Sequence, residues 1–159
     1  MPNRTRRGIL TGRRPTKKRI SGAATAGAGA HGTGAAAYVP TFLHMLNTVK
    51  LYHWKTTSFA THKATDELYG SLNEKLDHFV EVMLGKHELG GRSKLLNVPM
   101  VKLSMYSNNA AFTKQIENYK RFLLQMTQQL DGLLHADLLA IRDEILADFN
   151  KFLYLLSLK

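Results

Sequence analysis

The sequence predicts an all-α domain, arranged as a four-helix bundle with a long crossover between the second and third helices. Three observations favour this fold class. Apolar residues recur at helical spacing in four segments, the 159 residues include only 4 Pro, and no apolar run approaches the roughly 18 residues of a membrane span. Because the chain contains no Cys, disulfide frameworks, zinc fingers and thiolate catalysis are excluded.

The first half of the folded domain is predicted to form two helices joined by a short turn. Thr41 is expected to cap a helix that runs to about Lys55, and residues 56–58 interrupt the helical pattern. The second helix is predicted over about residues 59–84, and Gly85 ends it. The apolar core stripe of this helix is Leu68, Leu72, Leu76, Phe79 and Met83.

The second half of the domain is predicted to form another pair of helices after a long linker. Asn108 or Asn109 is expected to cap a third helix that runs to about Leu130. Residues 131–132 turn the chain, and the fourth helix carries apolar residues from 134 to 156. Short connections within each pair and one long crossover between the pairs are typical of the ferritin-like arrangement.

The N-terminal residues 1–40 are predicted to form a basic, Gly/Ala-rich flexible arm, which leaves the bundle at residues 41–159. The net charge of the chain is +10, and the arm contributes eight positive charges with no Asp or Glu. Residues 21–37 are low-complexity Gly/Ala sequence that buries too little to fold alone. The basic residues of the arm are Arg4, Arg6, Arg7, Arg13, Arg14, Lys17, Lys18 and Arg19.

Four polar side chains share one face of the predicted second helix: His62, Asp66, Asp77 and Glu81. At about 100° per residue they fall within one quadrant, about 130° from the core stripe. They are therefore expected to point away from their own bundle. The alternative is a solvated polar face, which charged helix residues usually form. The other histidines considered, His44, His78 and His135, are interpreted as packing or surface residues.

The spacing of these four residues fits a two-fold axis. Asp66 and Asp77 lie about 16 Å apart along the helix, too far to share one metal ion. An antiparallel copy of the helix, related by a two-fold axis near residues 71–72, brings His62 to the copy's Glu81. The same rotation brings Asp66 to the copy's Asp77. Mixed imidazole and carboxylate ligands suit iron or another divalent metal, and the two-fold would create two equivalent sites per dimer.

A longer motif resembles the ferroxidase signature of Dps, the ferritin-like DNA-binding protein from starved cells: His53-Trp54, then His62-x3-Asp66-x10-Asp77-x3-Glu81. The resemblance covers residues 41–159 in architecture. It implies five iron ligands: His53, His62 and Asp66 from one subunit, with Asp77 and Glu81 from across a two-fold axis. The step from His53 to His62 is shorter than is usual in that family, which leaves the position of His53 open.

The resemblance also implies an activity and an assembly. Fe(II) would bind at the dimer interface, peroxide or dioxygen would oxidise it, and ferric iron would be stored in a hollow shell. Shells of this family contain twelve subunits. The chain is therefore expected to be a homo-oligomer in the cytoplasm or nucleoid, with no membrane association.

Three interpretations of the basic arm and two rival functions remain. The arm resembles the Lys-rich tails of some Dps proteins and would then bind DNA phosphates without reading sequence. It is alternatively a transit peptide or a solubilising tail. Because Dps-like sequences also occur in phages and large DNA viruses, the first rival function is a structural virion component that contacts other capsid proteins. The second is a nucleic-acid-condensing protein without ferroxidase activity.

Overall fold

The computed structural model describes residues 34–158, and all regular secondary structure in this range is helical. The predicted arm lies outside the described residues up to position 33, together with all eight of its basic side chains. Residues 35–40 belong to the folded part, because a short 3-10 turn, η1 (Ala35–Ala37), leads directly into the first long helix. Within residues 34–158, no helix is long and apolar enough to cross a membrane.

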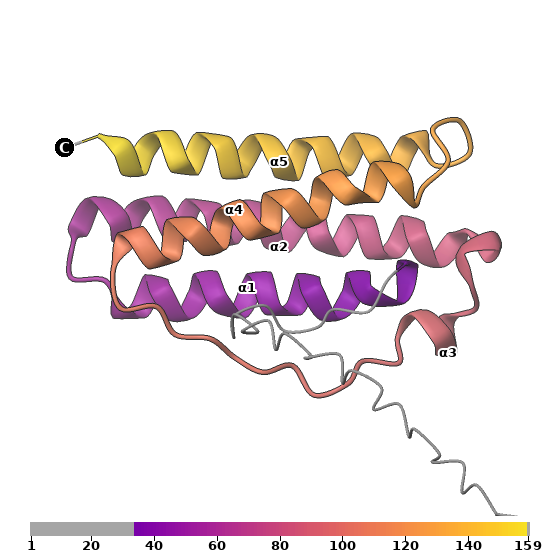
Figure 1. Cartoon of the computed structure of the whole chain (residues 1–159), viewed down its shortest axis with the longest axis horizontal. Helices are drawn as coiled ribbons and strands as arrows, with labels where there is room; N and C mark the ends of the chain where they lie inside the picture. The colour runs from indigo at the N-terminus through magenta and orange to yellow at the C-terminus, as the bar shows by residue number, and fades with distance from the viewer. Residues whose placement is uncertain (1–33, 159) are drawn as a thin grey trace, which may run out of the picture.

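Four long helices lie side by side in the molecule (Figure 1): α1 (Tyr38–Lys55), α2 (Phe59–Gly85), α4 (Asn109–Gln125) and α5 (Ala136–Ser157). α2 packs against α1 on one side and against α5 on the other, and α4 packs against α5. Short helical turns complete the described chain: η2 (His87–Leu89), α3 (Arg92–Leu95) and η3 (Met126–Gln128). The all-α prediction is therefore confirmed for the described residues.

Several helix ends lie where the sequence predicted them. The predicted break at residues 56–58 separates α1 from α2, and the Ser58 side chain accepts a hydrogen bond from the backbone N–H of Thr61. α2 ends at Gly85, as predicted. Asn108 caps α4, because its side chain accepts a hydrogen bond of 2.9 Å from the backbone N–H of Ala111.

Three predicted helix ends were wrong. Thr41 lies inside α1, where its hydroxyl donates to the carbonyl of Ala37. α4 ends at Gln125 instead of Leu130, although Leu130 is buried. α5 begins two residues after Leu134, which is 65% exposed. Apolar spacing indicates which residues are buried. A residue can be buried without belonging to the helix, because burial does not require that the helical backbone hydrogen bonds continue.

The long connection between α2 and α4, residues 86–108, runs along the molecule on the side of α1 and α4 (Figure 1). Its α3 turn is anchored by Leu95, which is fully buried. Further along, the Ser104 hydroxyl lies 3.4 Å from Nε2 of His44 on α1, and the ring of Tyr106 contacts Phe112 on α4. The connection therefore covers the side of the molecule formed by α1 and α4.

Aromatic side chains fill much of the core between the four helices. Near the start of α1, the rings of Tyr38 and Phe42 pack edge-on against Phe79 of α2. Burial raises the pKa of Tyr38 to about 12. Near the end of α1, the ring of Tyr52 stacks on Phe112 of α4 at a centroid distance of 3.9 Å. These contacts fix α1 against α2 and α4, and so fix where the end of α1 lies.

Candidate functional site

The turn between α1 and α2 brings two histidines into direct contact. The rings of His53 and His62 stack with their centroids 3.9 Å apart and their planes inclined by 24°. Nδ1 of His53 lies 3.1 Å from the backbone carbonyl oxygen of His62, and Nδ1 of His62 lies 3.1 Å from the carbonyl oxygen of His53. The short step between the two residues therefore holds His53 against His62.

These reciprocal contacts determine which nitrogen of each ring carries a proton. A carbonyl oxygen only accepts hydrogen bonds, so Nδ1 of both His53 and His62 must donate. In the neutral imidazole, Nε2 then carries the free lone pair. Metal-binding histidines are commonly held in this way, with one ring nitrogen donating to a carbonyl or carboxylate and the other free for the metal.

Thr65 adds a third contact to this histidine pair. Its side chain is fully buried, and its hydroxyl oxygen lies 3.2 Å from Nδ1 of His53. The same hydroxyl donates to the carbonyl of Thr61 at 2.8 Å, with the carbonyl of His62 at 3.0 Å. Because its single proton is used by a carbonyl, the oxygen can accept the proton of His53 Nδ1. Thr65 was not among the site residues predicted from the sequence.

Asp66 faces the free nitrogen of His53. Its Oδ1 lies 3.8 Å from Nε2 of His53, which is too long for a hydrogen bond and places two electron-pair donors around one small space. His53 is only 6% exposed, whereas the Asp66 side chain is 56% exposed and His62 is exposed. His53 therefore lies next to each of the other two predicted ligands of its subunit, against the ring of His62 and near the carboxylate of Asp66.

The two remaining predicted ligands lie elsewhere on the same helix. Asp77 and Glu81 are exposed on α2, and within residues 34–158 neither carboxylate forms a hydrogen bond or ion pair. They lie about three to five helical turns beyond His62 and Asp66. In the described part of the chain, no three His, Asp or Glu side chains converge closely enough to hold a metal ion. One chain thus presents two separate parts of a ligand set.

An aromatic and cationic cluster borders the histidine pair. The Nζ atom of Lys50 lies 5.6 Å from the ring centroid of Trp54 and 4.5 Å from that of Tyr69. Trp54 is 68% exposed, and Phe59 at the start of α2 is 78% exposed. Exposed aromatic groups of this size are commonly covered in an assembly. Lys50, which lies one helical turn before His53, was not among the site residues predicted from the sequence.

A groove of about 650 Å³ opens beside Asp66. It lies between the first part of α2 and the last turn of α5, and Asn109 of α4 closes one end. Leu155, Leu156 and Leu158 give it an apolar wall, and Gly70 contributes an edge without a side chain. Space remains around the position where a Cβ atom of Gly70 would lie. Of the predicted ligands, Asp66 alone lines this groove.

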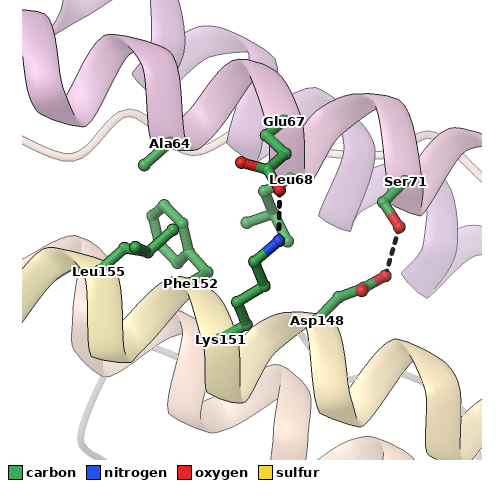
Figure 2. Close-up of a pocket in the computed structure, with 8 residues that line it drawn as sticks. All are labelled: Ala64, Glu67, Leu68, Ser71, Asp148, Lys151, Phe152 and Leu155. Carbon is green, nitrogen blue, oxygen red and sulfur yellow. Dashed lines mark hydrogen bonds and ion pairs between the residues drawn. The ribbon is translucent and has the colours of Figure 1, made fainter.

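A smaller pocket between α2 and α5, of about 100 Å³, is crossed by polar contacts (Figure 2). Lys151 of α5 forms an ion pair with Glu67 of α2, which raises the pKa of Lys151. Asp148 accepts a hydrogen bond of 2.6 Å from the Ser71 hydroxyl, and its Oδ2 also lies 2.7 Å from Nζ of Lys75. These contacts fasten α2 to α5 and leave the opposite, outward face of α2 unoccupied.

Two further histidines have structural surroundings, as expected of packing residues. His44 is buried, and its Nδ1 lies 2.8 Å from the hydroxyl of Tyr119, whose pKa burial raises. His135 is also buried, and its Nδ1 accepts a hydrogen bond from the backbone N–H of Asp131. Its Nε2 therefore carries the proton and faces Glu88 at 3.5 Å. This is the opposite tautomer to that of His53 and His62.

Comparison with known proteins identifies a family but no described activity. Residues 53–156 match the model of DUF5856, a family of unknown function. No curated protein and no solved structure matches the chain. The matched region begins at His53 and includes all five predicted ligands, and it extends over more than half of the sequence. The chain belongs to the DUF5856 family.

Proposed function

We propose that this protein is a Dps-like ferroxidase, which oxidises Fe(II) at a two-fold intersubunit site and stores the ferric product in a shell. The observation that carries the proposal is the arrangement at the start of α2. The rings of His53 and His62 are each held at Nδ1 by the backbone carbonyl of the other residue, and Asp66 Oδ1 lies 3.8 Å from Nε2 of His53. This donor set suits Fe(II).

The fold proposed for this function is the ferritin-like four-helix bundle. Four long helices joined by a short turn, a long connection and a second short turn fit that arrangement. The long connection of residues 86–108 takes the place of the crossover between the two helical pairs. The fold alone does not assign an activity, so the function depends on the site.

The site is completed by a second copy of the chain. A two-fold axis at the middle of α2 would place Glu81 of the copy beside His62, and Asp77 of the copy beside Asp66. Gly70 would then face Asn73 of the copy. Both residues are exposed, and the small side chain of Gly70 allows the helices to approach closely. The carboxylates without partners in one chain would thereby gain the metal ion as their partner.

The chemistry at such a site requires charge neutralisation and an oxidant. Two Fe(II) ions supply the two electrons that reduce one hydrogen peroxide to two water molecules, with two protons taken from solvent. The carboxylates Asp66, Asp77 and Glu81 offset the positive charge that grows as iron becomes ferric, and the neutral imidazoles bind without adding charge. Dioxygen is the alternative oxidant.

The basic arm is proposed to bind DNA through its phosphates without sequence preference. Eight basic residues and no acidic residue in the first 40 positions favour this interpretation. Removing residues 1–33 leaves η1 and the four long helices complete, and we expect this deletion to lower both the affinity for duplex DNA and its dependence on salt. A merely solubilising tail or a transit peptide predicts no change in DNA affinity.

The ferroxidase proposal is tested by loading the protein with Fe(II) under anaerobic conditions, adding peroxide and following ferric absorbance. We expect fast oxidation in the wild type and its loss in Asp66→Ala. Glu74→Ala is the matched control, because Glu74 is an exposed carboxylate on α2 without an ion pair among residues 34–158. Turnover no faster than in a protein-free control contradicts the proposal and favours a nucleic-acid-condensing or capsid protein.

A further inference from the structure

The described domain has two sides of opposite charge. α2 and α5 together carry nine Asp and Glu residues against four Lys and Arg residues. α1, the connection of residues 86–108 and α4 together carry nine Lys and Arg residues against two Glu residues. The domain therefore has a small net charge but a strong separation of charge between these two groups of elements.

These elements also lie on two different sides of the molecule. α2 and α5 pack directly against one another along their length. The later part of the connection lies against α1 and α4 instead, through the contacts of Ser104 with His44 and of Tyr106 with Phe112, whereas Lys86 at its start pairs with Asp137 of α5. Figure 1 shows the connection on the α1 side, away from α5. The positive charges of the connection are therefore added to those of α1 and α4.

Three cations of the connection are free to bind an external anion. Arg92, Lys94 and Lys102 are exposed, and none of them forms an ion pair with any residue from 34 to 158. Lys86 and Lys120 differ, since they pair with Asp137 and Glu117. The connection also exposes large side chains, but these are aliphatic or sulfur-containing: Leu96, Met100, Leu103 and Met105. Such a surface suits phosphates better than it suits stacking with unpaired bases.

The place where the arm joins the domain gives an independent indication of the partner. α3, which contains Arg92 and Lys94, packs against η1 (Ala35–Ala37). The chain therefore enters the folded domain beside these two cations. The eight basic residues of the arm precede this entry point in the sequence.

We propose that the side formed by α1, residues 86–108 and α4 is a second nucleic-acid-binding surface, which holds the phosphate backbone of duplex DNA next to the arm. The partner is a polyanion because only a phosphate chain matches a surface with this excess of positive charge. The acidic α2–α5 side repels DNA, so the outward face of α2 with His62 stays accessible to metal and to a second copy. The proposal deepens the DNA binding assigned above to the arm, and it does not require iron chemistry.

The test uses the full chain and duplex DNA of about 30 base pairs at several salt concentrations. The variant of the connection replaces three cations together: Arg92→Gln, Lys94→Gln and Lys102→Gln. A matched control removes the same net charge from the opposite side of the molecule, at three exposed positions of α5: Ala140→Glu, Ala147→Glu and Asn150→Asp. A third variant replaces the eight basic residues of the arm with Gln.

We expect the connection variant to bind DNA about 10- to 100-fold more weakly at 0.15 M salt. The slope of log affinity against log salt concentration should fall by about 2 to 3, since each phosphate contact contributes about 0.9. The α5 control should stay within about two-fold of the wild type, because charge remote from the phosphate backbone is screened beyond about 8 Å. The arm variant should keep residual binding through the three cations of the connection.

Three outcomes overturn the inference. In the first, the connection variant keeps the wild-type affinity and salt slope. In the second, the α5 control loses as much affinity as the connection variant, which would make net charge the cause. In the third, the connection variant changes the size of the assembly in sedimentation but leaves DNA binding intact, which would identify another copy as the partner. If the arm variant binds like the wild type and the connection variant does not, the role of the arm fails and this inference stands.

Discussion

The two ends of the outward face of α2 are organised in different ways. At its N-terminal end, His62 and Asp66 lie against His53 of α1, and backbone carbonyls fix the orientation of both histidine rings. At its C-terminal end, Asp77 and Glu81 are exposed and have no partner among residues 34–158. The chain thus preorganises one half of a ligand set by itself and leaves the other half to be organised by something outside it.

The largest effect is expected when the two ends of α2 are made defective in different chains. His62→Ala and Glu81→Ala should each abolish iron oxidation, because every two-fold site uses both residues. Co-expression of the two variants should restore activity to about a quarter of the wild type. About half of the dimers are mixed, and each mixed dimer contains one intact site and one doubly defective site.

The measurement is the initial rate of ferric absorbance per chain, after peroxide is added to anaerobically loaded protein. A mixture of His62→Ala with Asp66→Ala is the control, since both changes affect the same end of α2 and no pairing of these chains gives an intact site. If that control recovers as much activity as the test mixture, the site does not combine opposite ends of two helices.

The second prediction rests on the difference in burial between the two ends of the outward face of α2. His53→Ala should lower the free energy of unfolding by about 1 to 3 kcal/mol, because it removes a buried ring and the Nδ1 donor that faces the Thr65 hydroxyl and the His62 carbonyl. Glu81→Gln should leave unfolding unchanged, because Glu81 touches no partner within the described chain. Both variants should weaken metal binding.

Denaturant unfolding and calorimetric titration with Co(II), as a redox-stable substitute for Fe(II), check this prediction on the same samples. An unfolding curve of Glu81→Gln that shifts as far as that of His53→Ala would show that the C-terminal end of α2 has structural contacts of its own within the chain.

The third prediction concerns Thr65, which supports the preorganised end. Thr65→Val keeps the shape of the side chain but removes the oxygen that lies 3.2 Å from His53 Nδ1, so metal affinity should fall about ten-fold. Thr65→Ser keeps that oxygen and should restore most of the affinity. The imidazole 15N shifts of the metal-free protein should show a mixture of tautomers at His53 only in the valine variant. Equal shifts in the two variants would contradict this role.

The sequence predicted the helices well where burial was the only question. The core stripe of α2 and the breaks at residues 56–58 and Gly85 follow from apolar spacing and helix-ending residues, which are local properties. The ends of the helices near Thr41, Leu130 and Leu134 were misplaced. They depend on backbone hydrogen bonds that the apolar pattern does not report.

The site was predictable to the extent that its residues lie on one helix. Helical spacing placed His62, Asp66, Asp77 and Glu81 on a single face, and these residues are exposed on α2. His53 came only from the family resemblance, because its contact with His62 crosses a turn between two helices. Thr65 carries no spacing signal, since a threonine inside a helix ordinarily bonds to its own backbone.

The path of residues 86–108 could not be predicted, because the segment has no regular periodicity. Its course is decided by a few tertiary contacts, among them buried Leu95 and the approach of Ser104 to His44. The charge separation between the two sides of the molecule depends on that course. Composition showed only that the folded part has almost no net charge.

The smallest effect is expected from a change at the contact between α2 and α5, away from the outward face of α2. Asp148→Asn should lower the free energy of unfolding by about 1 to 2 kcal/mol, because it removes the ion pair of Lys75 and weakens the bond from the Ser71 hydroxyl. Metal affinity should be unchanged, because the α2 residues that Asp148 contacts, Ser71 and Lys75, are not among the predicted ligands. Chemical denaturation and Co(II) titration measure the two quantities separately. A loss of metal affinity as large as that of Thr65→Val would mean that the position of α2 depends on its contact with α5 as much as on its contact with His53.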